Sequence, residues 1–186
     1  LAHEMVSIRE ALDRTRDLLR DVDLPQHVFG QYPFQVSGGM AQRAMIAMAT
    51  AWKPDILIAD EPTSNLDTTI QADILARLKG LQQENKSSII LITHNLGVIA
   101  QMADQLAVMY GGAIMECGDT ATLFEHPMHP YTWGLMQSVI RLDQPDKPLN
   151  SIPGIPIDPF NMTDQCPYLS RCPKASSECR LNKRPP

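Results

Sequence analysis

The sequence predicts an α/β fold built around a parallel sheet, and three segments carry that prediction. Residues 56–59 and 88–93 are apolar runs that are too short for helices and suit buried parallel strands. The segment between them repeats apolar residues at helical spacing, at Ile70, Ile74, Leu78 and Leu81. A strand–helix–strand order joins parallel strands through a right-handed crossover, so we expect both strands to end at the same edge of one sheet.

Two helices are expected before the first strand. Residues 4–20 form a charged amphipathic pattern, and the helix should end before Pro25. After a polar loop, Ser37 suits the N-cap of a second helix, which ends ahead of Pro54. Four residues of this second helix share one face and are expected in the core: Met45, Met48, Ala49 and Trp52.

The chain changes character after the second strand. Within residues 106–116, apolar runs lie on both sides of Gly111-Gly112, which is the pattern of a β-hairpin. Another helix is expected over residues 129–139. Eleven of the fifteen prolines lie in the last third of the chain, and residues 145–159 are expected to be an extended linker.

Composition and charge disfavour three classes of protein: nucleic-acid-binding, membrane-spanning and secreted disulfide-rich proteins. The formal net charge of −5 over 186 residues disfavours a broad nucleic-acid-binding surface. No apolar run approaches the ~20 residues of a membrane-spanning helix, and the start has no secretory-signal pattern. The chain begins without methionine, in helix-like sequence, which suggests a fragment of a longer protein. Its four cysteines do not resemble a secreted disulfide scaffold, and Cys117 is expected to be a small buried hydrophobe.

Ser37, Gly38 and Gly39 begin the second helix and are candidate phosphate-binding residues. A helix N-terminus presents unpaired N–H groups and the positive end of the helix dipole, and glycines let a phosphate approach the backbone closely. The Ser37 hydroxyl supplies one more donor. The alternative is an ordinary N-cap followed by a tight turn.

Asp60 and Glu61 follow the first strand, and His94 follows the second. Side chains at the carboxyl ends of parallel strands point into the crevice where α/β proteins bind ligands. There an aspartate can hold Mg²⁺, a glutamate can orient or deprotonate an attacking water, and a histidine can hydrogen-bond a terminal phosphate oxygen. The alternatives are two solvated acids and a structural histidine.

The order of these features favours the functional alternatives. Asp67 precedes the helix that starts near Thr68, so it caps that helix or contacts a partner subunit beside the reaction centre. A helix N-terminus, a strand with two acids, an acidic turn and a strand with a histidine follow one another within about sixty residues. Four unrelated structural features would have to coincide in that order.

Residues 36–40, Val-Ser-Gly-Gly-Met, resemble the signature motif of ATP-binding-cassette (ABC) ATPases, which is usually Leu-Ser-Gly-Gly-Gln. Val36 and Met40 depart from the pattern, and Met40 gives up a side-chain hydrogen-bonding group. The resemblance implies that Ser37, the two glycines and the backbone at Met40 bind ATP held by an opposite subunit.

The acids and the histidine extend the resemblance. Asp60 and Glu61 resemble the Walker B motif with its catalytic glutamate, residues 64–67 resemble the D-loop, and His94 resembles the switch histidine. The resemblance implies that Asp60 serves Mg²⁺, Glu61 and His94 are catalytic, and Asp67 communicates across the dimer. No Gly-x-x-x-x-Gly-Lys-Ser/Thr phosphate loop occurs in the chain.

The resemblance also implies a division of the chain. Residues 1–52 would be a helical subdomain ending in the signature helix, and residues 53–125 a RecA-like α/β core. Together they would form the second half of an ABC-type P-loop NTPase domain. Residues 126–186 would be a proline- and cysteine-rich C-terminal extension.

The tail resembles the C-terminal extension of oligopeptide and dipeptide importer ATPases, a subfamily that also serves nickel. Residues 126–132, His-Pro-Met-His-Pro-Tyr-Thr, carry this resemblance together with the proline-rich linker and Cys166, Cys172 and Cys179. In that subfamily such cysteines are associated with an iron–sulfur cluster, so a [4Fe–4S] cluster or a zinc ion is expected once a fourth ligand is present. The alternative is three ordinary thiols, or one disulfide and a spare.

The implied function is that of an ATP-binding and ATP-hydrolysing subunit that energises peptide import. Its expected partners are transmembrane permease subunits, a second ATP-binding subunit of the same or a paralogous sequence and, indirectly, a peptide-binding protein, with no nucleic acid. The expected location is peripheral, on the cytoplasmic face of the bacterial inner membrane. This chain alone should be inactive. The rivals are a soluble ABC-type ATPase of DNA repair or translation and a non-catalytic degenerate fragment.

Overall fold

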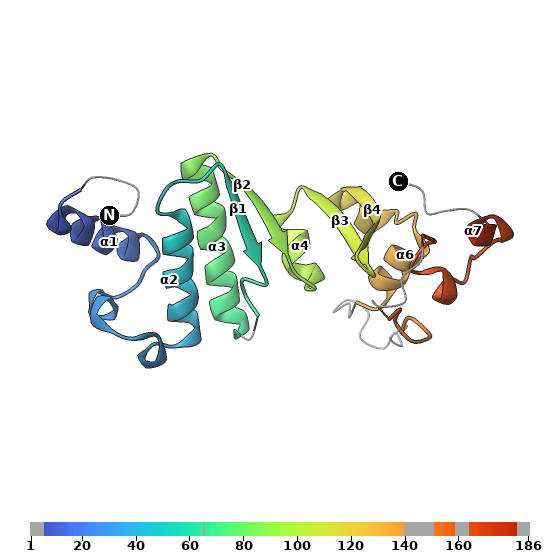
Figure 1. The fold of residues 1–186 in the computed structure, drawn as a ribbon, viewed down its shortest axis with the longest axis horizontal. Coiled ribbons are helices and arrows are strands. Elements are labelled where there is room, and N and C mark those ends of the chain that lie inside the picture. Colours follow the sequence, from blue (N-terminus) through green and yellow to red (C-terminus); the bar gives the residue numbers. More distant parts are fainter. Residues whose placement is uncertain (1–5, 65, 140–150, 159–163, 182–186) are drawn as a thin grey trace. The chain divides into compact units, whose positions relative to one another are not determined.

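The computed structural model describes residues 6–64, 66–139, 151–158 and 164–181 (Figure 1). The chain divides into two compact units, Leu1–Val98 and Ile99–Pro186, which are described one at a time. Among the described residues, no helix combines the length and apolar character needed to span a bilayer.

The first unit opens with the expected charged helix, α1 (Ile8–Asp21). Its N-cap is Ser7, whose hydroxyl oxygen accepts a hydrogen bond from the Glu10 N–H at 3.2 Å. Exposed ion pairs at helical spacing line its surface, such as Arg14 with Glu10 at 2.8 Å. Two short 3₁₀ segments follow, η1 (Gln26–Gly30) and η2 (Pro33–Gln35), and lead to the second helix.

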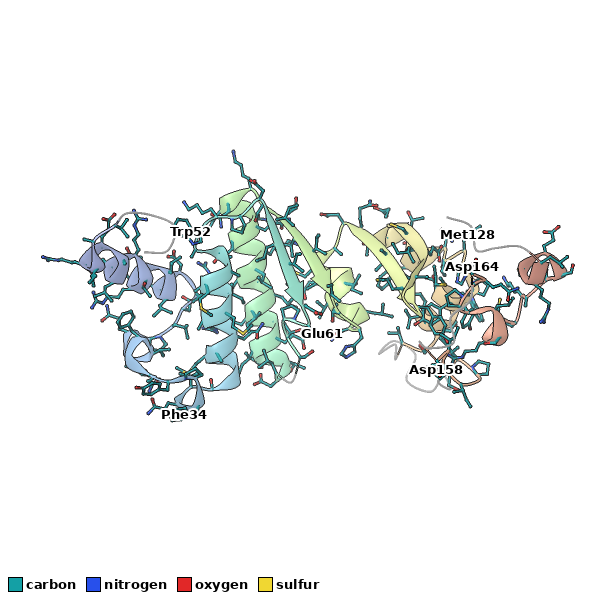
Figure 2. The ribbon with its side chains drawn as sticks, in the orientation of Figure 1. Phe34, Trp52, Glu61, Met128, Asp158 and Asp164 are labelled. Atoms are coloured by element: carbon teal, nitrogen blue, oxygen red, sulfur yellow. The ribbon has the colours of Figure 1, made fainter. Side chains whose placement is uncertain are left out.

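The second helix, α2 (Gly38–Thr50), begins where the sequence predicts, but its buried face is different. Its buried residues are Gly39, Ile46, Ala47 and Thr50. The expected core residues Met45 and Met48 are exposed, as is Ala49, and 55% of Trp52 is exposed (Figure 2). The prediction was wrong because α2 packs through its other face against α3, whereas Met45 and Met48 line an open apolar groove of about 620 Å³.

The predicted strand–helix–strand unit is confirmed. Strand β1 (Ile56–Asp60) pairs in parallel with β2 (Ser88–Ile92), and the register sets Asp60 opposite Ile92. Helix α3 (Thr68–Asn85) connects them and lies beside α2 (Figure 1). The centre of this unit is a set of α3 residues with almost no exposed surface: Ile74, Leu75 and Leu78.

The sheet is buried on one face only, which corrects the expectation of two fully buried strands. Leu57 is buried, but 66% of Ile58 is exposed, and three neighbours on the same face are exposed as well: Ile56, Ile90 and Ile92. Side chains alternate between the two faces of a strand, so an apolar run is buried throughout only where both faces are covered. Within the first unit, none of the described residues covers the isoleucine face.

The second unit is built on the predicted hairpin. Helix α4 (Leu96–Met102) precedes it, and the boundary between the units falls within that helix. Strands β3 (Gln105–Tyr110) and β4 (Ala113–Asp119) pair in antiparallel fashion around Gly111 and Gly112, which have φ of 52° and 70°. Such angles favour glycine, so the turn needs this pair. Among the described residues, the helical segments that follow are α5 (Thr120–Glu125), α6 (Pro130–Gln137), η4 (Leu169–Arg171) and α7 (Ser177–Leu181).

The His-Pro-Met-His-Pro-Tyr-Thr segment is anchored to the hairpin by Glu116 of β4. The two oxygens of its carboxylate accept hydrogen bonds from the Met128 N–H at 2.8 Å and the His129 N–H at 3.1 Å. His129 then caps α6, because its Nδ1 accepts a hydrogen bond from the Tyr131 N–H. The motif therefore starts α6 at a fixed position on β4.

The cysteine-bearing tail packs on the same hairpin through Tyr110. The rings of Tyr131 and Tyr168 lie 4.7 Å and 5.4 Å from the Tyr110 ring, centroid to centroid. Arg171 donates hydrogen bonds to the Tyr110 hydroxyl and to the Pro153 carbonyl oxygen. Aromatic and guanidinium contacts thus connect the tail to the hairpin.

Two smaller expectations concern this unit. Cys117 is exposed, not buried as expected, because its side chain projects from β4 away from the buried neighbours of the hairpin. Of the predicted linker, residues 151–158 contain neither helix nor strand, and residues 145–150 and 159 lie outside the described residues.

Candidate active site

The candidate site is built where β1 and β2 end. Asp60 is the last residue of β1, and the next N–H, that of Glu61, donates to the Ile92 carbonyl oxygen at 2.9 Å. Glu61 has a φ of 45°, in the left-handed region that residues other than glycine seldom adopt. The chain therefore turns sharply off the sheet at Glu61, and such backbone strain is frequent at functional sites.

The carboxylate of Glu61, which Figure 2 labels, is held by two other residues. The Ser64 hydroxyl donates to Oε2 at 2.6 Å. The His94 N–H donates to Oε1 at 3.1 Å, and Nδ1 of the His94 ring lies 2.6 Å from the same oxygen. The predicted location of His94, at the same sheet edge as the two acids, is therefore confirmed; its role in hydrolysis stays a prediction.

These contacts favour the charged form of Glu61. The hydrogen bond from Ser64, followed by the one from His94, lowers the pKa of Glu61 below its ordinary value. The carboxylate, which is ionised at neutral pH even with an ordinary pKa, can only accept hydrogen bonds. Such a group is suited to orienting a water molecule and to accepting its proton as charge develops.

His94 presents its other ring nitrogen to solvent. Its side chain is 85% exposed, and an ionised carboxylate cannot donate, so Nδ1 must carry the proton shared with Glu61. In a neutral ring Nε2 is then an acceptor. Donation from Nε2 to a phosphate oxygen requires the doubly protonated ring or release of the Glu61 contact.

Asp60 has the chemistry expected of a magnesium ligand. Its carboxylate is exposed at the end of β1 and forms no hydrogen bond or ion pair with the residues that the structure describes. Mg²⁺ prefers such oxygen ligands and keeps several of its own waters. Asp60 could therefore supply one ligand to a magnesium ion, whose other ligands would be water and phosphate oxygens.

Two of the signature-like residues, Ser37 and Gly39, have structural roles, and Ser37 also keeps a hydrogen-bond donor free for a ligand. The Ser37 oxygen caps α2 by accepting from the Met40 N–H at 3.3 Å, which leaves the hydroxyl hydrogen free to donate. Gly38 is exposed, whereas Gly39 is buried against α3. A Cβ added at Gly39 would lie 3.0 Å from Ile70 Cγ2, so this glycine is needed for helix packing.

Sequence reasoning missed the residues that join these motifs. Arg43 of α2 forms an ion pair with Asp73 of α3 and donates to the Asp23 carbonyl oxygen. The bond from Ser64 to Glu61 was missed as well, although a serine three residues after an acid across a proline turn is a detectable signal.

Asp67 caps α3, as one of its two interpretations predicted. Its Oδ1 accepts hydrogen bonds from the Thr69 N–H at 3.1 Å and the Ile70 N–H at 2.9 Å. Its neighbour in the D-loop-like segment, Asn65, lies outside the described residues. Any contact of Asp67 with a partner subunit stays a prediction.

The tail cysteines do not gather into a metal site. Cys166 and Cys172 are half-buried free thiols, and Cys179 is exposed and contacts Ser176 at 3.3 Å. Within the described ranges, no group of three or more His, Cys, Asp or Glu side chains is arranged to hold a metal ion. The residues present therefore do not fit a [4Fe–4S] cluster or a zinc ion in this arrangement.

Comparison with known families matches both parts of the chain. The family model described as "ABC transporter" matches residues 3–64, and that described as "Oligopeptide/dipeptide transporter, C-terminal region" matches residues 115–179. The chain is 48% identical over 181 residues to the dipeptide transport ATP-binding protein DppD of Bacillus subtilis, covering 96% of this chain and 54% of that protein. The chain belongs to the oligopeptide and dipeptide family of ABC transporter ATP-binding proteins.

Other members and solved structures agree with this assignment. The chain is 47% identical over 152 residues to the oligopeptide transport ATP-binding protein OppD of Haemophilus influenzae, covering 82% of this chain and 47% of that protein. The cassette of MJ0796, solved as a dimer and described as a bacterial ABC transporter cassette, superposes with a TM-score of 0.57 at 29% identity, over 63% of this chain and 50% of that one. The ABC cassette fold is thereby confirmed, and the chain spans about half the length of the relatives it matches.

Proposed function

We propose that the chain is part of an ATP-hydrolysing subunit that powers the import of oligopeptides or dipeptides through a membrane permease. The observation that carries the proposal is the hydrogen-bonded pair of Glu61 and His94 at the ends of two parallel strands, 2.6 Å apart. The relatives named as dipeptide and oligopeptide transport ATP-binding proteins support the choice of cargo.

In this proposal the water that attacks ATP is oriented by Glu61. The ionised carboxylate accepts a hydrogen bond from the water and takes its proton as the water oxygen bonds to the γ-phosphorus; the bond from that phosphorus to the β–γ bridging oxygen breaks, and ADP leaves with those electrons. His94, with both ring nitrogens protonated, donates from its solvent-facing Nε2 to a γ-phosphate oxygen while Nδ1 donates to Glu61. Asp60 holds Mg²⁺, which when bound offsets the charge of the phosphate oxygens.

The signature residues are proposed to act in trans. Ser37 donates its free hydroxyl hydrogen to the γ-phosphate of ATP bound to a second ATP-binding subunit, and Gly38, Gly39 and Met40 bring the helix N-terminus close to it. Asp67 signals across the same dimer. The second subunit has the same or a paralogous sequence.

The assembly is proposed to sit peripherally on the cytoplasmic face of the bacterial inner membrane. ATP hydrolysis opens the dimer, and linked movement of the permease subunits releases peptide delivered by a binding protein. Within the chain, residues 1–52, 53–125 and 126–186 act as helical subdomain, α/β core and extension. No nucleic acid takes part.

A soluble ABC-type ATPase of DNA repair or translation is not favoured. The match of residues 115–179 to the C-terminal region of oligopeptide and dipeptide transporters argues against it. An iron–sulfur cluster has no part in the proposed mechanism. The spacing of Cys166, Cys172 and Cys179 and the subfamily resemblance favour one, but the described residues contain no group of side chains arranged to hold a metal ion.

The test uses the intact ATPase subunit reconstituted in vesicles with its permease and its partner subunit. Hydrolysis of ATP should rise when a peptide-loaded binding protein is added outside, and labelled peptide should cross the membrane. ATP hydrolysis that is indifferent to permease and peptide, together with sedimentation of the protein with ribosomes or DNA, would contradict the proposal.

A further inference from the structure

The turn that follows β1 holds Ser64 in a fixed position beside Glu61. The Ser64 N–H donates to the Glu61 carbonyl oxygen at 3.2 Å, which closes a four-residue turn. The two residues inside the turn, Pro62 and Thr63, are buried, and proline has a fixed φ. The turn therefore keeps the backbone of Ser64 close to the carboxylate, and the hydroxyl reaches Oε2 from there.

The acceptor positions of the Glu61 carboxylate are nearly all in use. An ionised carboxylate has about four lone-pair positions. His94 takes two of them on Oε1, through its backbone N–H and Nδ1, and the Ser64 hydroxyl takes one on Oε2. The remaining position lies on Oε2, the oxygen that Ser64 holds.

We propose that Ser64 is a positioning residue for hydrolysis: its hydroxyl fixes the Glu61 carboxylate so that the last acceptor position on Oε2 is kept for the attacking water. This inference rests on the proposed function, since it assigns Ser64 a part in the reaction of Glu61. His94 holds one carboxylate oxygen and Ser64 holds the other, so rotation of the carboxylate about its Cγ–Cδ bond breaks a contact at each end. A carboxylate held in this way needs less reorganisation when the water binds.

The test compares variants of Ser64 in the intact ATPase subunit assembled with its partners. Ser64→Ala should lower kcat about tenfold, the effect of one hydrogen bond to a charged group at an exposed position, with KM for ATP unchanged. Ser64→Thr keeps the hydroxyl and should stay within about twofold of the parent. Ser88→Ala, at an exposed serine on β2 outside the site, is the matched control and should have no effect.

A double-mutant cycle separates positioning from a structural role. Ser64→Ala added to Glu61→Gln should cause no further loss of the residual hydrolysis, because Ser64 acts only through the carboxylate. Parental kcat in Ser64→Ala, or an additional loss in the Glu61→Gln background, would overturn the inference. If Glu61→Gln hydrolyses ATP at the parental rate, the proposed role of Glu61 is wrong, and the inference about Ser64, which rests on it, is wrong as well. If Glu61→Gln is inactive while Ser64→Ala is fully active, the inference about Ser64 is wrong and the proposed role of Glu61 stands.

Discussion

Nδ1 of His94 lies 2.6 Å from Oε1 of Glu61, although 33 residues separate them in the sequence. The parallel register of β1 and β2, with Asp60 opposite Ile92, brings the residues after each strand together. The bond keeps His94 within reach of Glu61 and leaves Nε2 facing solvent. The two residues that we propose to be catalytic are therefore held together.

Replacing His94 with alanine in the intact subunit should lower ATP turnover at least about 100-fold, because a γ-phosphate donor and an anchor of Glu61 are lost together. Phosphate release under saturating Mg-ATP is the measurement. His27→Ala, at an exposed histidine of η1, is the matched control and should keep parental turnover. Unimpaired turnover in His94→Ala would show that no essential phosphate contact is made there.

The 186-residue chain on its own should bind ATP weakly and hydrolyse it little. It has no Gly-x-x-x-x-Gly-Lys-Ser/Thr loop, whose N–H groups and lysine cradle the β- and γ-phosphates in this class of ATPase. Titration calorimetry and phosphate release measure binding and turnover, with the intact subunit as the positive control. Robust Mg-ATP turnover by the chain alone would contradict the expectation.

Gly39→Ala should destabilise the first unit by about 1–2 kcal/mol relative to Gly38→Ala, because of overpacking. The new Cβ at position 39 would meet Ile70 Cγ2 at 3.0 Å, and the β-branched Ile70 has few rotamers to escape into. At Gly38 the nearest contact, Leu66 Cδ2 at 3.7 Å, is ordinary. Urea unfolding of both variants is the measurement, and Ile70→Ala should relieve the difference. Equal free energies of unfolding for the two variants would show that α3 shifts to make room for the added Cβ without a measurable cost.

Acid should destabilise the second unit through His129 and Glu116. Burial lowers the pKa of His129 below 6.5, and the negative charge of Glu116 opposes this effect only in part. The imidazole of His129 therefore binds a proton more tightly in the unfolded chain than in the folded one. Partial burial alone would raise the pKa of Glu116, but the neighbouring Thr132 hydroxyl and the N–H donors of Met128 and His129 outweigh it and lower the pKa below 4.5. Both groups therefore stabilise the fold at neutral pH, and that stability is lost as pH falls below about 6.5 and again below about 4.5.

Unfolding followed by Trp133 fluorescence, in a Trp52→Phe background, isolates this unit. His129→Asn keeps an N-cap acceptor for α6 and should remove the first loss of stability, while Glu116→Gln should cost about 1 kcal/mol at neutral pH. His126→Asn, at an exposed histidine, should change neither step. Stability that rises on acidification would give the opposite sign and refute the assignment.

The parts of the fold set by local pattern were predictable from the sequence. Ser37 and Asp67 cap helices where their spacing predicts, and the parallel pairing of the two apolar runs follows from the helix between them. Placement of His94 beside Glu61 followed from the same topology.

The predictions that were wrong concern which faces of the helices and strands are covered by other elements. Periodicity shows that Met45, Met48 and Trp52 share a face of α2, but it does not say whether another element covers that face. The same holds for Ile58 on the open face of the sheet. The hydrogen bond from Ser64 to Glu61 was missed although the serine follows the acid by three residues across a proline. The bond also depends on a φ of 45° at Glu61, which the sequence does not predict for a glutamate.

Whether Glu61 activates the water that attacks ATP can be decided with Glu61→Gln in the intact subunit. Glutamine keeps the shape and an acceptor oxygen but cannot take the proton, so hydrolysis should fall at least about 100-fold. ATP binding and ATP-dependent association of two subunits should persist, measured together by radiolabelled ATP retention and size-exclusion chromatography. We expect a stable ATP-bound dimer without turnover, and turnover at the parental rate would show that Glu61 is not the general base.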